Sequence, residues 1–255
     1  MRNTAAKGRS RGWRLLMWAA FGALGLSCAA SELQAQDPPA IAENRALTVG
    51  LIGAGNMGGP LGQLLAAAGH QVVYSSRNPA ELIELVQSAA PRAAAAFPDA
   101  AAVFADVVIL AVPPSAIPQL GEDIGHLLVG KVVIDITNPR LDRDGPITNE
   151  WLEMGTGMAM AQYLPGARMV KAFNTLGANM LGNSVRPDGR IGVPIAGDDP
   201  DAVAIVTAIV RDAGFDPVVV GPLARAKDFD RGTPVWVTGM TGAEVREALG
   251  LPPGT

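Results

Sequence analysis

A glycine-rich turn between two short apolar runs constrains the fold of this chain more than any other feature. The mostly apolar run Leu47–Ile52 leads into Gly53, Gly55 and Gly58, which have the spacing GxGxxG. A stretch with leucines at helical spacing then ends at Gly69, and a second apolar run, Gln71–Tyr74, follows directly. Because the three glycines stand between a strand and a helix of one strand–helix–strand unit, they predict a Rossmann-type nucleotide-binding turn.

Each glycine has its own expected task in such a turn. Gly53 permits the tight bend, Gly55 lets the backbone approach a pyrophosphate, and Gly58 lets the helix pack closely on the strand. The N-terminus of the helix then offers free N–H groups and a partial positive charge to the phosphates. We therefore expect a dinucleotide here rather than a glycine-rich turn without a ligand.

The end of the second strand indicates which dinucleotide. An NAD-binding unit has an acid there for the ribose hydroxyls, and that acid would repel a 2′-phosphate. This chain instead has Ser75, Ser76 and Arg77, two hydroxyls and a guanidinium that suit a phosphate dianion. We therefore predict NADP(H). Asn78 and Glu81 predict a capping box for a helix that begins beside this phosphate.

The next part of the chain continues the sheet. The runs Val107–Val112 and Val132–Ile136 predict buried strands, and the alanine-rich residues 93–104 predict a short strand and a small helix. In such sheets, ligands bind at the carboxyl ends of the strands. The loops at Val112–Pro114 and Thr137–Pro139 are therefore expected beside the nicotinamide, and Val112, Pro113 and Asn138 are its expected neighbours.

Strands and helices also alternate in the second half of the chain. The segment Met169–Phe173 predicts a strand, residues 191–221 predict strand, helix and strand, and residues 241–250 predict a last helix. The fold class expected is α/β, a doubly wound, mostly parallel Rossmann-type sheet extended by a smaller C-terminal α/β portion. We expect an NADP-binding domain at 47–140 and an extension at 141–255 that completes the sheet and the acceptor site.

The N-terminus has the pattern of an export signal. A basic head with five positive charges precedes the uncharged run Leu15–Leu26, which is too short to span a membrane, and small residues follow. We expect a signal peptide at 1–35 with cleavage after Ala35, or lipidation at Cys28, and a linker at 36–46. The alternatives are an uncleaved anchor or a misassigned start, which would leave the protein in the cytoplasm.

The charge of the chain limits its partners. The chain has 20 basic and 24 acidic residues, and loss of the signal, with five bases and one acid, leaves a net charge of −8. We therefore expect no nucleic-acid partner. We also expect no membrane span in the mature chain and a small-molecule redox acceptor as partner, and a homodimer stays open. The mature chain has no cysteine and no His/Glu spacing for a metal.

Six motifs in order resemble the coenzyme F-420-dependent NADP oxidoreductases, with the Steap reductase domain and the N-terminal domain of pyrroline-5-carboxylate reductases as relatives. They are "IGAGNMGGPLGQLLAAAGH", "SSRNP", "VILAVP", "KVVIDITNP", "VKAFNTLG", and "AGDDPDAVAIV" with "GFDPVVVGPLARA". The resemblance runs from about Thr48 to Trp236 and implies hydride transfer between NADPH and a flat acceptor, such as the deazaflavin F-420 or a flavin. The resemblance implies that Gly53, Gly55, Asn56 and Met57 lie at the pyrophosphate. It implies Ser76 and Arg77 at the 2′-phosphate. Beside the nicotinamide it implies Val112, Pro113, Asn174 and Thr175.

Other functions stay open from the sequence. A hydroxyacid dehydrogenase or imine reductase would have a similar glycine region, but the strands of the C-terminal half disfavour its largely helical second half. A non-catalytic NADPH-binding sensor is the other alternative. Hydride transfer between two cofactors needs orientation more than an acid or base. Lys171 is the one candidate proton donor, and as a strand residue it is expected to face outward or to form an ion pair.

Overall fold

The computed structural model describes residues 45–254 of the chain. The predicted signal peptide, with its sites at Cys28 and Ala35, and nearly all of the predicted linker lie outside it. Within the range, no helix is both long enough and apolar enough to cross a membrane.

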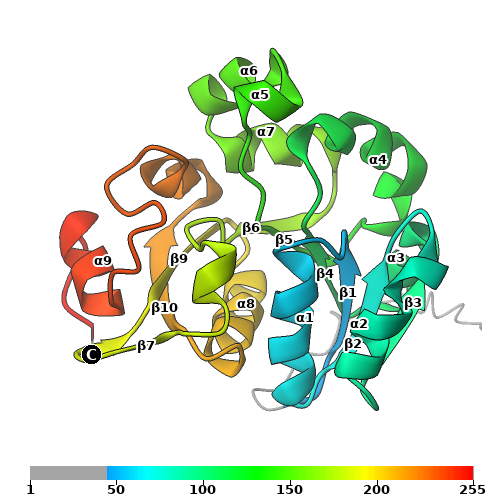
Figure 1. Cartoon of the computed structure of the whole chain (residues 1–255). Coiled ribbons are helices and arrows are strands. Elements are labelled where there is room, and N and C mark those ends of the chain that lie inside the picture. Colours follow the sequence, from blue (N-terminus) through cyan, green and yellow to red (C-terminus); the bar gives the residue numbers. More distant parts are fainter. Residues whose placement is uncertain (1–44, 255) are drawn as a thin grey trace, which may run out of the picture. The chain divides into compact units, whose positions relative to one another are not determined.

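A twisted sheet of eight strands forms the centre of the molecule, in the order β10-β9-β6-β5-β4-β1-β2-β3 (Figure 1). All neighbouring strands are parallel except the pair β6 and β9. The fold class predicted from the sequence, a doubly wound and mostly parallel sheet, is confirmed. The strands are β1 (Thr48–Ile52), β2 (Gln71–Ser75), β3 (Ala93–Ala96), β4 (Val107–Leu110), β5 (Val132–Asp135), β6 (Arg168–Lys171), β9 (Gly192–Gly197) and β10 (Asp216–Gly221).

Helices cover both faces of this sheet, and Figure 1 shows α1 and α8 on one side with α4 and α7 on the other. The burial of β4 explains why both faces need cover. Val107 and Ile109 pack with α1 and α8, whereas Val108 and Leu110 pack with α3, α4 and α7. The helices are α1 (Gly58–Ala67), α2 (Ile83–Ser88), α3 (Pro98–Phe104), α4 (Ile117–Ile124), α5 (Leu141–Asp144), α6 (Ile147–Met154), α7 (Thr156–Tyr163), α8 (Pro200–Asp212) and α9 (Gly242–Ala248).

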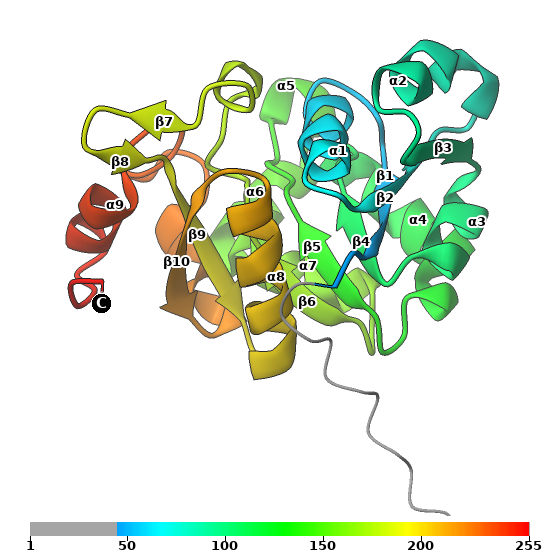
Figure 2. The same ribbon diagram turned by 90° about the horizontal axis from the view of Figure 1, so that it is seen from below.

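Short 3₁₀ turns and one hairpin complete the structure. The hairpin of β7 (Val185–Arg186) and β8 (Gly189–Arg190) lies near α9, at the β10 end of the sheet (Figure 2). The turns are η1 (Pro79–Leu82), η2 (Pro114–Ala116), η3 (Gly125–Leu127), η4 (Ala178–Met180) and η5 (Leu223–Phe229).

Side chains near the N-termini of the two C-terminal helices cap them. Asp199 caps α8, because its Oδ1 accepts hydrogen bonds from the backbone N–H groups of Asp201 and Ala202, each at 3.0 Å. Thr241 and Glu244 form the capping box of α9. These contacts join residues close in sequence, which is why the sequence alone predicts them.

Two local predictions are wrong, and one helical segment was not predicted. Asn78 does not cap a helix with its side chain oxygen; its Nδ2 donates to Glu81 Oε1 at 2.7 Å, and a 3₁₀ turn begins there. The predicted strand Met169–Phe173 ends at Lys171, and Phe173 has a left-handed φ of 59°. Residues 141–163, for which no helix was predicted, form α5, α6 and α7.

Candidate functional site

The glycine turn after β1 places each of its three glycines under a different constraint. Gly53 has a φ of +100°, and a Cβ there would lie 2.7 Å from the carbonyl oxygen of Ala111. A Cβ on Gly58 would lie 2.0 Å from the carbonyl oxygen of Gly53. A Cβ on Gly55, in contrast, would meet no heavy atom of residues 45–254 within 4 Å. The protein itself thus leaves open the space above Gly55, where the sequence predicts a pyrophosphate.

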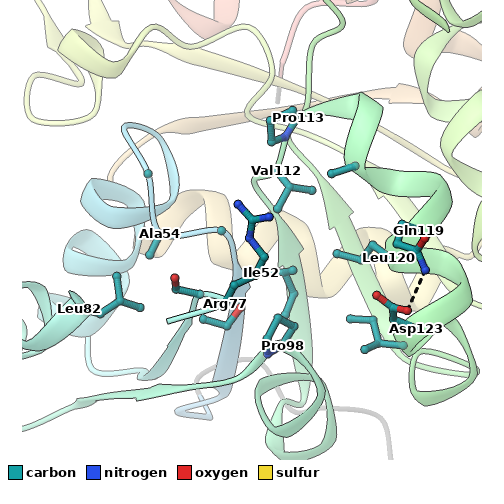
Figure 3. A pocket seen from close by; sticks show the side chains of 16 residues that line it. Ile52, Ala54, Arg77, Leu82, Pro98, Val112, Pro113, Gln119, Leu120 and Asp123 are labelled. Carbon is teal, nitrogen blue, oxygen red and sulfur yellow. Dashed lines mark hydrogen bonds between the residues drawn. The ribbon is translucent and has the colours of Figure 1, made fainter. Parts of the chain in front are cut away.

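A cavity of about 610 Å³ opens beside this turn, at the carboxyl ends of β1, β2 and β4 (Figure 3). Here the connections leaving β1 and β4 run in opposite directions along the sheet, and doubly wound sheets bind ligands at such a point. Seven of the predicted site residues line the cavity together: Gly53, Gly55, Ser75, Ser76, Arg77, Val112 and Pro113. Segments far apart in sequence therefore form one concave site.

The exit of β2 brings two hydroxyls and a guanidinium to the cavity. Ser75 is buried, and its Oγ has no hydrogen-bond partner among the described residues. Ser76 Oγ accepts a hydrogen bond from Asn78 N at 3.1 Å. Arg77 is exposed, forms no ion pair within residues 45–254, and extends between Ile52 and Val112 in Figure 3. A guanidinium and a buried hydroxyl that line one cavity, both without a partner among residues 45–254, fit a phosphate group.

The far wall of the cavity comes from residues that the sequence analysis missed. Gln119 and Asp123 lie one turn apart on α4, and Gln119 Nε2 donates to Asp123 Oδ1 at 3.0 Å (Figure 3). The helical spacing after the proline turn was the available signal. The lining residues not predicted are Ile52, Ala54, Leu82, Pro98, Ala116, Gln119, Leu120, Asp123 and Ile124.

The remaining predicted residues lie outside this cavity. Asn56 and Met57 stand on the turn before α1, with Asn56 exposed. Asn138, Asn174 and Thr175 lie where β5 and β6 end, and Asn138 Nδ2 donates to the carbonyl oxygen of Asn174 at 2.7 Å. The structure thus brings the loops after β5 and β6 together at one location, whereas Val112 and Pro113 line the nucleotide cavity.

Unsatisfied polar atoms gather at this second location. Asn174 is fully buried and its Nδ2 donates to the carbonyl oxygen of Phe229 at 3.1 Å. At this location, the side-chain oxygens of Thr137, Asn138, Asn174 and Thr175 have no hydrogen-bond partner in the described part of the chain. Buried polar groups normally find a partner, so these atoms fit a polar ligand group such as the carboxamide of a nicotinamide.

Lys171 forms a buried ion pair and does not face outward. Its Nζ lies 2.9 Å from Asp135 Oδ2 and donates to the carbonyl oxygen of Thr137 at 2.6 Å, and neither charged side chain is exposed. Nearby, Asp230 accepts hydrogen bonds from the backbone N and the Oγ1 of Thr156. Burial raises the pKa of Asp230, although the positive charge of Lys171 opposes that rise. Lys171 therefore holds the loop after β5 in place.

His70 is also structural. Its Nδ1 accepts a hydrogen bond from the backbone N–H of Leu47 at 3.1 Å, and its Nε2 lies 3.2 Å from Asp212 Oδ2. These contacts join the start of β1 to the end of α8, far from the cavity at the carboxyl ends of the strands.

Comparison with known sequences gives a family match over the strands that carry the nucleotide cavity. Residues 48–139 match the family described as "NADP oxidoreductase coenzyme F420-dependent". Metalloreductase STEAP3 of Rattus norvegicus is 31% identical over 184 residues, which cover 71% of this chain and 35% of that protein. The chain thus spans about a third of the length of the curated relatives that it matches.

Solved structures share the fold. Protein SMa0349 of Sinorhizobium meliloti, described as hypothetical, is 28% identical with a TM-score of 0.63, and the match covers 77% of this chain and 96% of that one. A protein of Arthrobacter sp. FB24, provisionally described as an F420-dependent NADP reductase, is 24% identical with a TM-score of 0.64, and the match covers 81% and 96% of the two chains. The second likeness is one of fold alone.

Proposed function

Because residues 48–139 match the family of coenzyme F420-dependent NADP oxidoreductases, we propose that this protein transfers a hydride between NADPH and a flat redox acceptor. The acceptor class is a deazaflavin such as coenzyme F-420, a flavin, or a compound of similar shape. In the direction of NADPH oxidation, the acceptor gains the hydride and a proton from solvent, and NADP⁺ is released.

The observation that carries the proposal is the chemistry at the exit of β2. Ser75, Ser76 and Arg77 line the cavity of the glycine turn, and none of the three is an acid. An acid there would be needed for selective NAD binding and would repel a 2′-phosphate. The open space above Gly55 supports a pyrophosphate in the same cavity. The exit of β2 favours NADP(H) over NAD(H), whereas the space above Gly55 suits the pyrophosphate of either dinucleotide.

The residues of the chain would bind and orient rather than react. Bound NADPH supplies the hydride itself, and the glycine turn and Arg77 would hold its phosphates. The loops that carry Val112, Asn138 and Asn174 would hold the nicotinamide end. Lys171 and Asp135 would keep the loop after β5 rigid, since both are fully buried and paired. Orientation of this kind can supply a large part of the rate for a reaction between two cofactors.

The test is anaerobic oxidation of NADPH by the purified chain, followed by the loss of nicotinamide absorbance. The acceptors are a deazaflavin, FMN, riboflavin, ferric chelates and a small cyclic imine, and NADH replaces NADPH in a parallel series. Gly55→Val serves as the control that cannot bind nucleotide. We expect a deazaflavin or flavin to be reduced, faster with NADPH than with NADH, and only by the wild type.

Other outcomes would contradict the proposal in distinct ways. Turnover with the imine alone would identify an imine reductase. Tight NADPH binding with no turnover of any acceptor would identify an NADPH-binding sensor. Equal rates with NADH and NADPH would show that the exit of β2 does not select the 2′-phosphate.

We also propose that the protein is exported. The proposal rests on the basic head and the apolar run Leu15–Leu26. N-terminal sequencing of the cell-derived protein tests it. A start at Gln36, or a lipid on Cys28, is the expected result, and an intact Met1 on protein from the cytoplasm would contradict it.

A further inference from the structure

A second hollow, of about 510 Å³, lies next to the loop that follows β5. Its walls come from that loop, from α5 and α6, and from the segment after η5, of which Arg231 is a part. In Figure 1, α5 and α6 lie together above the ends of β5 and β6. None of the residues that line the nucleotide cavity lines this hollow.

The hollow nevertheless adjoins the expected nicotinamide end. Pro139, one of its lining residues, directly follows Asn138. Asp144 at the end of α5 fixes this helix on the turn after β4, because its Oδ1 accepts hydrogen bonds from Ser115 Oγ at 3.0 Å and Ser115 N at 3.3 Å. The same turn carries Val112 and Pro113. The hollow is therefore attached to both loops that are expected to hold the nicotinamide.

The hollow carries one positive charge in excess. Arg140 is already paired with Asp142, with Nη2–Oδ2 and Nε–Oδ1 distances of 2.5 and 3.1 Å. Arg231 forms no ion pair with any acid of the described range, and its guanidinium lies 4.8 Å from the centre of the Trp236 ring. Contact with the aromatic face holds the guanidinium in a defined position. Its N–H groups stay available for an anion.

The other walls are apolar or lack a partner. Leu141 is 61% exposed and Leu152 is 39% exposed, although both are large aliphatic side chains. Thr148 is buried, and its Oγ1 has no hydrogen-bond partner within the described residues. Exposed apolar side chains gathered in a hollow with a few polar groups are typical of a small-molecule site. Apolar walls suit a flat ring, and a cation at the edge suits a negatively charged tail.

We propose that this hollow holds the hydride acceptor and that Arg231 binds an anionic group, a phosphate or a carboxylate, on the acceptor's tail. The inference rests on the proposed function, since it assigns a place and a charge to the second substrate. Arg231 is then a specificity-determining residue. A neutral ring system of the same shape would bind more weakly.

FMN and riboflavin are matched probes, because they share one ring system and differ by the phosphate. Their affinities are measured by fluorescence quenching with saturating NADP⁺, so that no hydride is transferred and the nucleotide cavity is filled. We expect FMN to bind about 10-fold more tightly than riboflavin, equivalent to ~1.4 kcal/mol. Arg231→Gln should remove that difference and leave riboflavin unchanged.

Arg190→Gln is the control for net charge. Arg190 is exposed on the β7–β8 hairpin, and Figure 1 shows that hairpin far from α5 and α6. This variant should keep the full preference for FMN. Equal binding of the two flavins by the wild type, binding of neither, or an unchanged preference in Arg231→Gln would overturn the proposal.

The proposed function has a separate readout. The same variants are assayed for anaerobic NADPH oxidation with each flavin and with the deazaflavin. A preference for FMN that depends on Arg231, without any turnover, would support the hollow and contradict the reductase. Turnover with no preference between FMN and riboflavin would support the reductase and contradict the hollow.

Discussion

Two glycines of the turn after β1 allow nucleotide binding to be separated from folding. A Cβ at position 55 would have no heavy atom of the described residues within 4 Å, whereas a Cβ at position 58 would lie 2.0 Å from the carbonyl oxygen of Gly53. Carbon–oxygen contacts usually lie at about 3.3–3.6 Å. Gly58→Ala must therefore move the backbone by about an ångström or more. Gly55→Val requires no such movement of the backbone.

The two variants are expected to change different quantities, stability in Gly58→Ala and affinity for NADPH in Gly55→Val. Overpacking of this kind costs about 1–3 kcal/mol, and each kcal/mol lowers the Tm of a domain this size by about 2–4 °C. Gly58→Ala should therefore lower the Tm by about 2–12 °C. Gly55→Val should leave the Tm within about 2 °C, since exposed substitutions stay near ±0.5 kcal/mol. Its side chain would fill the pyrophosphate space, and the Kd for NADPH should rise at least ~100-fold, or about 2.8 kcal/mol.

Calorimetry and a fluorescence titration with NADPH measure the two quantities. Gly182→Val is the matched control, because Gly182 is exposed, has no left-handed φ, and would also place its Cβ in open space. That control should change neither the Tm nor the Kd. A folded Gly55→Val protein with wild-type affinity for NADPH would refute the placement of the pyrophosphate.

Three further predictions concern charged side chains. Arg77→Ala should weaken NADPH about 10- to 100-fold and NADH very little, since it removes one charged hydrogen bond of roughly 1.5–3 kcal/mol; titrations with both nucleotides decide this, and equal weakening would contradict it. Lys171→Met should destabilise the protein by about 3–5 kcal/mol in urea unfolding, because it leaves Asp135 buried without its partner; a smaller loss would mean that the pair is not buried in solution. Hydrogen bonds from Arg168 lower the pKa of Asp199 from 3.8 to about 2 in the folded state, so this carboxylate stabilises the fold above pH 3.8 and the contribution disappears as the pH falls toward 2. Asp199→Ala should cost about 1 kcal/mol at neutral pH and lose less stability than the wild type over that acid range; unfolding curves at pH 2, 4 and 7 measure both effects.

Local features of the sequence determined much of the fold and the first part of the site. The spacing of Gly53, Gly55 and Gly58 predicts the turn, because a tight bend and a close helix–strand contact each exclude a Cβ. The runs around Val107–Leu110 and Val132–Asp135 predict buried strands, because a sheet covered on both faces needs apolar residues on both sides. Caps such as Asp199 are predictable for a similar reason, since the donors lie two or three residues away.

Contacts between distant segments were decided only by the tertiary structure. Gln119 and Asp123 form the far wall of the nucleotide cavity. Helical periodicity cannot show this, because it indicates which residues share a face of the helix but not what that face lies against. No local pattern shows that Asn138 meets the backbone of Asn174 across two strands. Lys171 resembles a surface residue in sequence. The antiparallel strand β9 pairs with β6 and makes it an inner strand of the sheet, and the carboxylate of Asp135 lies beside the buried lysine. A buried charge is stable only with such a partner, and chain topology supplies that partner from 36 residues away.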